Sequence, residues 1–367
     1  MKLHQKFGLI LSTISLLSFM SYANAETKVI ASIKPLHSLV SYVMDGVGTP
    51  GILVDGSSSP HTFQLKPSHA TMLQEADIVF WIGEDLESFL ETPLESIAAN
   101  SRHITLMESD EIELLKFREK NIFGGHDDHD DHGDEHDEHG DEHADEHGDE
   151  HDEHGDEHDE HGDEHADEHG DEHDEHADEH GDEHDEHGDE HDDHHDGHAH
   201  GEHDIHFWLD PEIAKTIVKI VARELSEIDP SNASTYESNS TKAINEIDQL
   251  ISDTKSKINS NASYVVFHDA YQYFEKRFGV EVVGALTVNP EVLPGAKQLS
   301  EIREVIEHEN INCLFSEPQF NPSIAETIAQ DTGVKAAVID PLGAELNPGK
   351  DLYFDLIGNI ASSFESC

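Results

Sequence analysis

Basic residues are scarce in this chain of 367 residues, which carries 21 Lys and Arg against 81 Asp and Glu. The formal net charge of −60 argues against nucleic-acid binding, because contacts with phosphate depend on clustered Lys and Arg. Long apolar runs are also scarce. Only the N-terminus offers one, which excludes a protein with many membrane spans. Ordinary apolar segments elsewhere in the chain exclude a wholly disordered protein.

Signatures of common hydrolases are missing as well. The chain has no His-Glu-x-x-His motif of zinc proteases, no Gly-x-Ser-x-Gly nucleophile elbow and no phosphate-binding loop. The sequence therefore favours a protein that is not an enzyme. A secreted zinc hydrolase stays open as an alternative, because catalytic zinc sites keep a water molecule at one coordination position.

The N-terminus has the features of an export signal. Lys2 and Lys6 give a basic start, residues 7–20 are mostly apolar, and Ala23-Asn24-Ala25 supplies a small-x-small cleavage pattern. This pattern predicts a signal peptide over residues 1–25 and a mature protein outside the cytoplasm. In such a compartment the two cysteines either pair or remain free thiols.

Histidine is concentrated in one segment, since 24 of the 32 His lie between His126 and His203. They belong to an acidic tract, residues 126–204, that has no Lys or Arg. Repulsion among the carboxylates and the recurring Gly predict that the metal-free tract is a disordered insertion. Imidazole and carboxylate bind divalent metals such as zinc, so the tract indicates metal handling, with a plain acidic linker as the alternative.

Short apolar runs alternate with amphipathic stretches on both sides of this tract, which is typical of α/β units. We predict an N-terminal lobe over residues 26–229, which includes the tract, and a C-terminal lobe over residues 260–367. Residues 230–259 have one apolar stripe at helical spacing, which predicts a long connecting helix. Two such lobes leave a cleft between them. The predicted strands are Val29–Ile33, Ile52–Val54, Ile78–Ile82, Ile104–Leu106, Tyr264–Phe267, Val280–Leu286, Cys313–Phe315 and Ala336–Ile339.

Four coordinating side chains stand where the chain leaves or enters an apolar element: His61, His206, His268 and Asp340. Ligands of open α/β sheets bind beyond the carboxyl ends of the strands, where these residues are predicted to lie. Zinc takes about four N, O or S donors in a tetrahedral array, and these positions can supply them from both lobes. The sequence therefore predicts a zinc site at the rim of the cleft.

Six short segments occur in order along the mature chain: Ser32-Ile33-Lys34-Pro35-Leu36-His37, Pro60-His61-Thr62-Phe63, His206-Phe207-Trp208-Leu209-Asp210-Pro211, Phe267-His268-Asp269-Ala270-Tyr271, Glu317-Pro318-Gln319-Phe320 and Asp340-Pro341-Leu342-Gly343. Through these segments the mature chain resembles the periplasmic substrate-binding proteins of bacterial high-affinity zinc ABC transporters, which belong to the cluster A-I metal-binding proteins. The resemblance implies two Rossmann-like α/β lobes, a long rigid helix between them, and zinc held in the cleft.

The resemblance also implies roles for particular residues. His61, His206 and His268 match the three His ligands, and the fourth donor is either water or Asp340, which manganese-binding relatives use. Those relatives are expected to have Glu in place of His268, so His at this position favours zinc. Glu84 and Glu317 are candidates for orienting a His ligand. The resemblance further suggests a disulfide between Cys313 and Cys367.

The expected function is capture of Zn²⁺ in the periplasm and delivery of the ion to a membrane ABC permease with its ATPase, by a monomer. Besides the hydrolase, a passive zinc store or a metal-linked surface adhesin is an alternative that the His-rich tract by itself would allow.

Overall fold

The computed structural model of the chain describes residues 26–118, 120–122, 201–258, 262–290 and 292–367. The predicted signal peptide and residues 126–200 of the acidic tract lie outside the described residues. No helix of the described part is both long and apolar enough to cross a membrane.

The first half of the described chain builds a parallel four-stranded sheet in the order β2-β1-β3-β4. Its two central strands, Val29–Ile33 and Ile78–Trp81, are buried along their whole length, as expected of parallel strands that helices cover. Three helices follow the strands in sequence, and Pro at the first turn of two of them starts the helix. The elements are β1 Val29–Ile33, α1 Lys34–Val43, β2 Gly51–Val54, α2 Pro67–Glu75, β3 Ile78–Trp81, α3 Glu91–Ser96 and β4 Arg102–Thr105.

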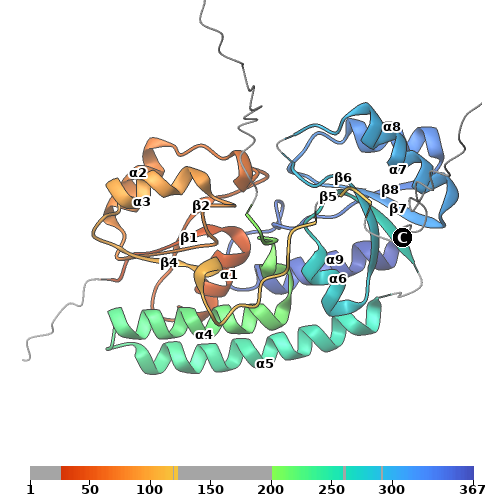
Figure 1. Cartoon of the computed structure of the whole chain (residues 1–367). Coiled ribbons are helices and arrows are strands. Elements are labelled where there is room, and N and C mark those ends of the chain that lie inside the picture. Colours follow the sequence, from red (N-terminus) through yellow and green to blue (C-terminus); the bar gives the residue numbers. More distant parts are fainter. Residues whose placement is uncertain (1–25, 119, 123–200, 259–261, 291) are drawn as a thin grey trace, which may run out of the picture. The chain divides into compact units, whose positions relative to one another are not determined.

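The second half repeats this arrangement with a parallel sheet in the order β6-β5-β7-β8. The first strand of each half is therefore a central strand of its sheet (Figure 1). The elements are β5 Ser263–His268, α6 Gln272–Phe278, β6 Glu281–Thr287, α7 Ala296–His308, β7 Ile311–Ser316, α8 Ser323–Thr332, β8 Lys335–Val338 and α9 Leu352–Ser366.

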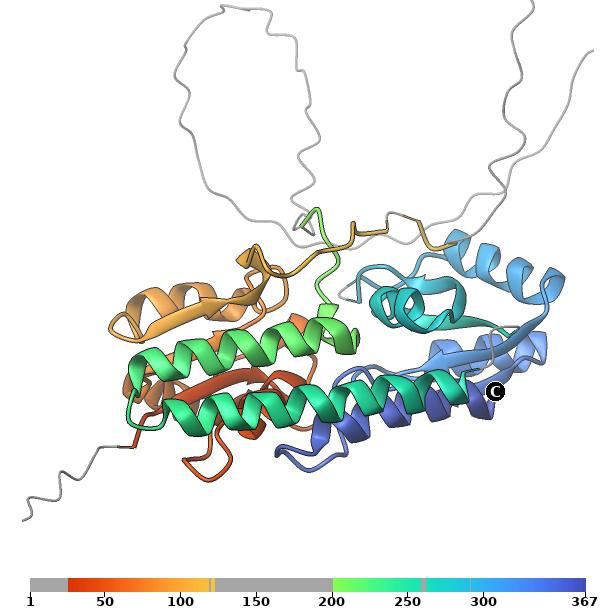
Figure 2. The same cartoon turned by 90° about the horizontal axis from the view of Figure 1, so that it is seen from below.

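Two long helices lie between the sheets in sequence. Helix α4 spans Pro211–Ile228 and begins at Asp210, whose carboxylate caps the helix by accepting from Glu212 N. Helix α5 spans Ala233–Lys257, runs beside α4, and contacts both α1 and α9 (Figures 1 and 2). A helix of 25 residues is about 37 Å long, so α5 reaches from elements of the first half to elements of the second.

A second connection is made by residues 112–118 and 120–122, which we call the crossing segment. It begins in the first half and ends against β6, where Ala285 N donates to Asn121 O at 2.8 Å and an antiparallel bridge joins Ile122 to Gly284. A Cβ at Gly284 would lie 2.8 Å from Asn121 O, so only glycine allows this approach. The described end of the acidic tract pairs with the same segment, through a bridge between His203 and Lys116.

The predicted disulfide is present. It joins Cys313 of β7 to Cys367, which follows α9, with 5.8 Å between the Cα atoms. The apolar face of α9 packs on the core through buried residues such as Phe364. The bond therefore fixes the end of the chain to the C-terminal sheet.

Two helices, α6 and α9, were not predicted from the sequence. The aromatic residues of α6 suit a strand as well as a helix, and Gly279, with φ of 71°, ends it in the left-handed region. Both helices are fixed by packing against the core rather than by local sequence preference.

Candidate metal centre

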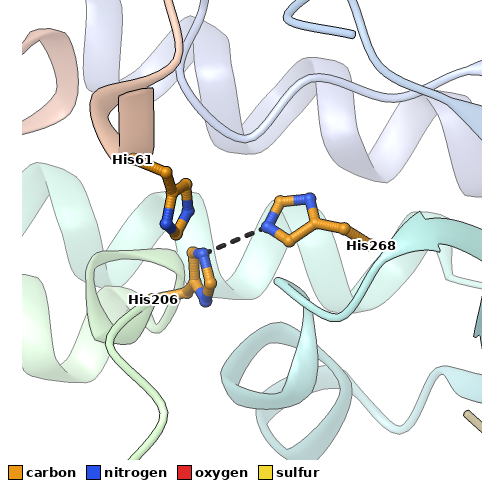
Figure 3. Close-up of side chains that lie close together, drawn as sticks. All are labelled: His61, His206 and His268. Atoms are coloured by element: carbon orange, nitrogen blue, oxygen red, sulfur yellow. Dashed lines mark hydrogen bonds between the residues drawn. The ribbon is translucent and has the colours of Figure 1, made fainter. Parts of the chain in front are cut away.

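Three histidines from distant parts of the chain meet in one place. His61 lies in a short 3₁₀ helix beyond β2, His206 precedes the 3₁₀ helix Phe207–Leu209, and His268 is the last residue of β5. One ring nitrogen from each lies within 4.8 Å of the others. Figure 3 shows the rings converging, with His206 Nε2 and His268 Nε2 3.2 Å apart. The described residues contain no other such group of His, Cys, Asp or Glu.

Two of the rings are oriented by buried carboxylates. The Nδ1 atom of His206 lies 2.8 Å from Asp204 Oδ1, and that of His268 lies 2.9 Å from both oxygens of Glu317. Because a carboxylate only accepts, each Nδ1 carries the proton and each Nε2 is left with a lone pair directed into the cluster. This carboxylate–histidine arrangement is the one that fixes zinc-bound imidazoles in proteins.

Burial and charge shape the protonation of these groups. His206 and His268 are 4% and 3% exposed, and the two carboxylates that orient them are equally buried. Burial lowers the pKa of His268, but the charge of Glu317 outweighs it and the pKa is raised. Burial raises the pKa of Asp204 to about 7, against the opposing effects of its hydrogen bond from His206 N and of Arg118. Two Nε2 lone pairs this close repel unless a proton or a cation lies between them.

A buried charged cluster lies next to the histidines. Arg118 of the crossing segment bonds Asp269 Oδ1 at 3.1 Å and Glu275 Oε2 at 2.7 Å. Burial raises the pKa of both Asp269 and Glu275 to about 7, and Arg118 partly offsets that effect. The crossing segment thus supplies a positive charge that bonds the buried acids beside His268.

The spacing of two of the three nitrogens suits a zinc ion. With Zn–N bonds of about 2.0–2.1 Å and tetrahedral angles, two imidazole nitrogens on one zinc lie ~3.3 Å apart. The observed 3.2 Å between His206 Nε2 and His268 Nε2 needs almost no adjustment. The donors are neutral imidazoles, which zinc prefers over harder cations such as Mg²⁺ or Ca²⁺.

The structure does not bring Asp340, the fourth predicted site residue, into this group. Its carboxylate accepts four hydrogen bonds: from Gln319 Nε2 at 2.8 Å and from the backbone N–H groups of Leu342, Gly343 and Ala344 at 3.0, 3.0 and 2.6 Å. Asp340 therefore holds the loop that follows β8.

Of the two glutamates considered as partners of the ligands, Glu317 contacts His268 and Glu84 is exposed. The other histidines of the described residues stay apart from the cluster. His37 bonds Pro50 O, His69 accepts from Lys66 N, and His103 bonds Ala98 O. Sequence reasoning missed Asp204 as a partner of His206, because it is the last of 41 acids in the tract and nothing local distinguishes it.

A small cavity adjoins the cluster. It offers only about 10 Å³ to the centre of a water-sized sphere, which is close to the minimum for one water molecule. A single water molecule or ion fits such a space, whereas an organic substrate does not. The lining residues are Ser59, Pro60, His61, His206, Trp208, His268, Glu317, Gln319, Phe320, Pro341 and Leu342.

Comparisons with known proteins agree with this geometry. Residues 29–367 match the family model described as zinc-uptake complex component A, periplasmic. A high-affinity zinc uptake system protein ZnuA from Brucella abortus is 41% identical over 349 residues, which cover 95% of this chain and 93% of that protein.

Two solved structures share the fold. A crystal structure of ZnuA aligns with a TM-score of 0.65 and 19% identity, covering 93% of this chain and 99% of that one. A ZnuA deletion mutant with zinc bound aligns with a TM-score of 0.64 and 19% identity, covering 93% and 97%.

Proposed function

The chain belongs to the family of periplasmic zinc-uptake components, and we propose that it binds one Zn²⁺ tightly at His61, His206 and His268 and delivers the ion to a membrane permease. The fourth donor in this proposal is Asp340 or a water molecule. The observation that carries the proposal is the convergence of three imidazoles, two of them oriented by buried carboxylates. Membership in a transport family means that the chain is not an enzyme, and the relatives give no support to the hydrolase, store or adhesin alternatives.

Capture and release follow from the chemistry of imidazole. Neutral Nε2 atoms bind the ion, and burial removes competing water from around it. Protons compete with zinc for the same nitrogens, so acidification weakens the site. A delivery protein needs such a route for release, and contact with a permease can serve the same end.

The surrounding arrangement of the transport system is part of the proposal. Residues 1–25 act as a signal peptide that sends the chain to the periplasm, where the mature protein works as a monomer with an ABC permease and its ATPase. The lobes over residues 26–229 and 260–367 hold the site between them, and residues 230–259 connect them. The acidic tract gathers zinc near the site through weak, multiple contacts.

Competition with a zinc chelator tests the tight site in the full mature chain, because the chelator outcompetes weak ligands. The unaltered protein is expected to retain one ion under these conditions, and His268→Ala to retain none. The matched control is His308→Ala, an exposed histidine on α7. Retention of one tightly held ion by His268→Ala would overturn the proposed site.

A further inference from the structure

One lysine is buried where the two halves of the described chain meet. Lys34 is the first residue of α1 and is only 3% exposed. A lysine is almost never buried so completely unless it is paired, and the positive end of the helix dipole disfavours a cation at this position. Both costs have to be offset by strong partners. The oxygens that surround Lys34 therefore indicate its role.

These oxygens come from both halves. Lys34 Nζ donates to Ala344 O at 2.9 Å and to Leu346 O at 2.7 Å, in the loop that follows β8. Asp55 Oδ1, just after β2, lies 3.7 Å from the same nitrogen. An ammonium has three N–H groups. Two of them bind main-chain oxygens of the C-terminal half, and Asp55 of the N-terminal half offers a partner for the third.

The loop over residues 340–346 forms one wall of the metal site. Pro341 and Leu342 line the small cavity together with the three histidines. Trp208 Nε1, beside His206, donates to Pro341 O at 2.9 Å. The wall is therefore held where it faces the cavity, by one neutral hydrogen bond, and a few residues further along, by Lys34.

Ala344 of this loop is held from two sides. Its N–H donates to Asp340 Oδ2 at 2.6 Å, and its carbonyl oxygen accepts from Lys34 Nζ. Hydrogen bonds to ionised groups are roughly twice as strong as those between neutral groups. The bond to Asp340 lies within the loop, whereas the bond from Lys34 joins the loop to α1. Movement of the wall away from α1 would thus break the Lys34 bonds and leave the Asp340 bonds intact.

The size of the cavity makes the wall important for exchange of the ion. The space of about 10 Å³ holds little more than one water molecule, so a larger incoming donor needs one of the walls to move. The same wall restricts an arriving ion and a departing one. A contact that keeps the wall closed therefore slows both steps.

We propose that Lys34 is a latch, which keeps the 340–346 loop closed over the three histidines and sets how fast zinc enters and leaves. This inference rests on the proposed function, since it takes His61, His206 and His268 as ligands. Lys34 is a positioning residue in this proposal and does not touch the ion. Breaking its two bonds to the loop frees the wall, while the histidines and the carboxylates that orient them keep their places.

Stopped-flow fluorescence of the full mature chain tests the latch. Trp208 is the reporter, because its ring centroid lies 5.3 Å from that of His206. Lys34→Met keeps the length of the side chain and removes its charge and donors. Dissociation of zinc into excess chelator is expected to become about 10- to 100-fold faster, because hydrogen bonds to a charged group are lost. Association should become faster as well, so the affinity should change less than either rate.

The matched control is Lys350→Met. Lys350 also joins the two halves, through Asp45 Oδ2 at 2.7 Å, but both side chains are exposed, so this variant should change neither rate. Lys34→Arg restores a cation with N–H donors and should bring both rates back toward those of the unaltered chain. Equal dissociation rates in Lys34→Met and Lys350→Met would overturn the latch. Faster dissociation with unchanged association would also overturn it, because that result indicates distorted ligands.

Thermal melting of the metal-free variants establishes that they fold. If Lys34→Met does not fold, Lys34→Gln takes its place with the same expected direction, since its amide keeps donors but no charge. Failure of the latch is distinguishable from failure of the proposed function. Loss of tight zinc binding in His268→Ala, with Lys34→Met equal to Lys350→Met, removes only the latch. Unchanged zinc binding in His268→Ala removes the site itself.

Discussion

The two sheets share one structural feature, which serves a different purpose in each half. In each, a buried glutamate follows the third strand of that half and bonds a side chain near the end of the first strand. In the N-terminal sheet Glu87 accepts from Ser32, and in the C-terminal sheet Glu317 accepts from His268. The same position therefore stabilises a hydroxyl in one half and aims a metal-site imidazole in the other.

The comparison extends to how firmly each half holds its histidine. His268 is part of a central strand, whereas His61 is half-buried in a 3₁₀ turn beyond β2, and only the C-terminal sheet carries a disulfide. Backbone hydrogen bonds on both sides fix a central strand, but a short turn depends on fewer contacts. The C-terminal half thus supplies the more constrained part of the site.

The largest expected difference between the two sheets is in stability, when the disulfide is removed. Replacing both Cys313 and Cys367 by Ser should lower the free energy of unfolding by about 4 kcal/mol, because the bond closes a loop with a sequence separation of 54 residues. Hydrogen exchange should show the loss of protection in β5 to β8, with β1 to β4 little changed. Equal loss in both sheets would mean that they unfold as one unit.

The next largest difference is expected between the zinc affinities of variants that lack a histidine from one half or from the other. His268→Ala should weaken zinc binding by roughly 100- to 1000-fold, since one ligand of a four-coordinate zinc contributes about 3–4 kcal/mol. His61→Ala should cost less, because water can take the place of a half-buried side chain. Calorimetric titration in the presence of a competing chelator measures both. Equal losses would show that the turn holds its ligand as firmly as the strand does.

Glu87, the buried glutamate of the N-terminal half, makes the stability of the fold depend on pH. Burial raises the pKa of Glu87 to about 7, although its bonds from Ser32, Gly83 N and Ile82 N oppose the shift. The folded chain therefore binds this proton more tightly than the unfolded chain, so the stabilisation is present below about pH 4.5 and is lost as the pH rises to about 7.

Glu87→Gln should remove about 3 kcal/mol of this pH dependence, because a neutral amide can accept from the two backbone N–H groups and donate to Ser32. Thermal unfolding of the metal-free protein from pH 4.5 to 8 measures it. A variant with the same pH profile as the unaltered chain would contradict the raised pKa.

The smallest effect is expected from the carboxylates that orient the ligands. Glu317→Gln and Asp204→Asn should each weaken zinc binding about 10- to 100-fold. The reason is that the imidazole loses its charged partner but keeps its position. Glu307→Gln, an exposed change on α7, is the control. Zinc titration that finds the control and Glu317→Gln equal would separate Glu317 from the metal.

Much of this arrangement follows from the sequence. The central strands could be predicted because strands that are buried throughout, such as β1 and β3, are largely apolar runs, and the histidines because they stand near the ends of apolar segments. The orientation of the side chains around the site could not be predicted. His268 is the last residue of β5, whereas Asp340 lies beyond the end of β8 at Val338. Backbone N–H groups that fold back around Asp340 engage its oxygens, and no local pattern reveals this. Gln319 acquires its direction only from Asp340.

The meeting of the crossing segment with β6 has a consequence for association between molecules. An outer strand with free N–H and C=O groups is a template on which a second chain can pair, and exposed outer strands are common starting points of aggregation. Here Asn121 and Ile122 cover part of the row of backbone groups along β6. Asn121 Nδ2 also donates hydrogen bonds to the carbonyl oxygens of Ala285 and Leu286. A stretch from the other half of the chain thereby blocks part of the outer edge of this sheet against strand addition.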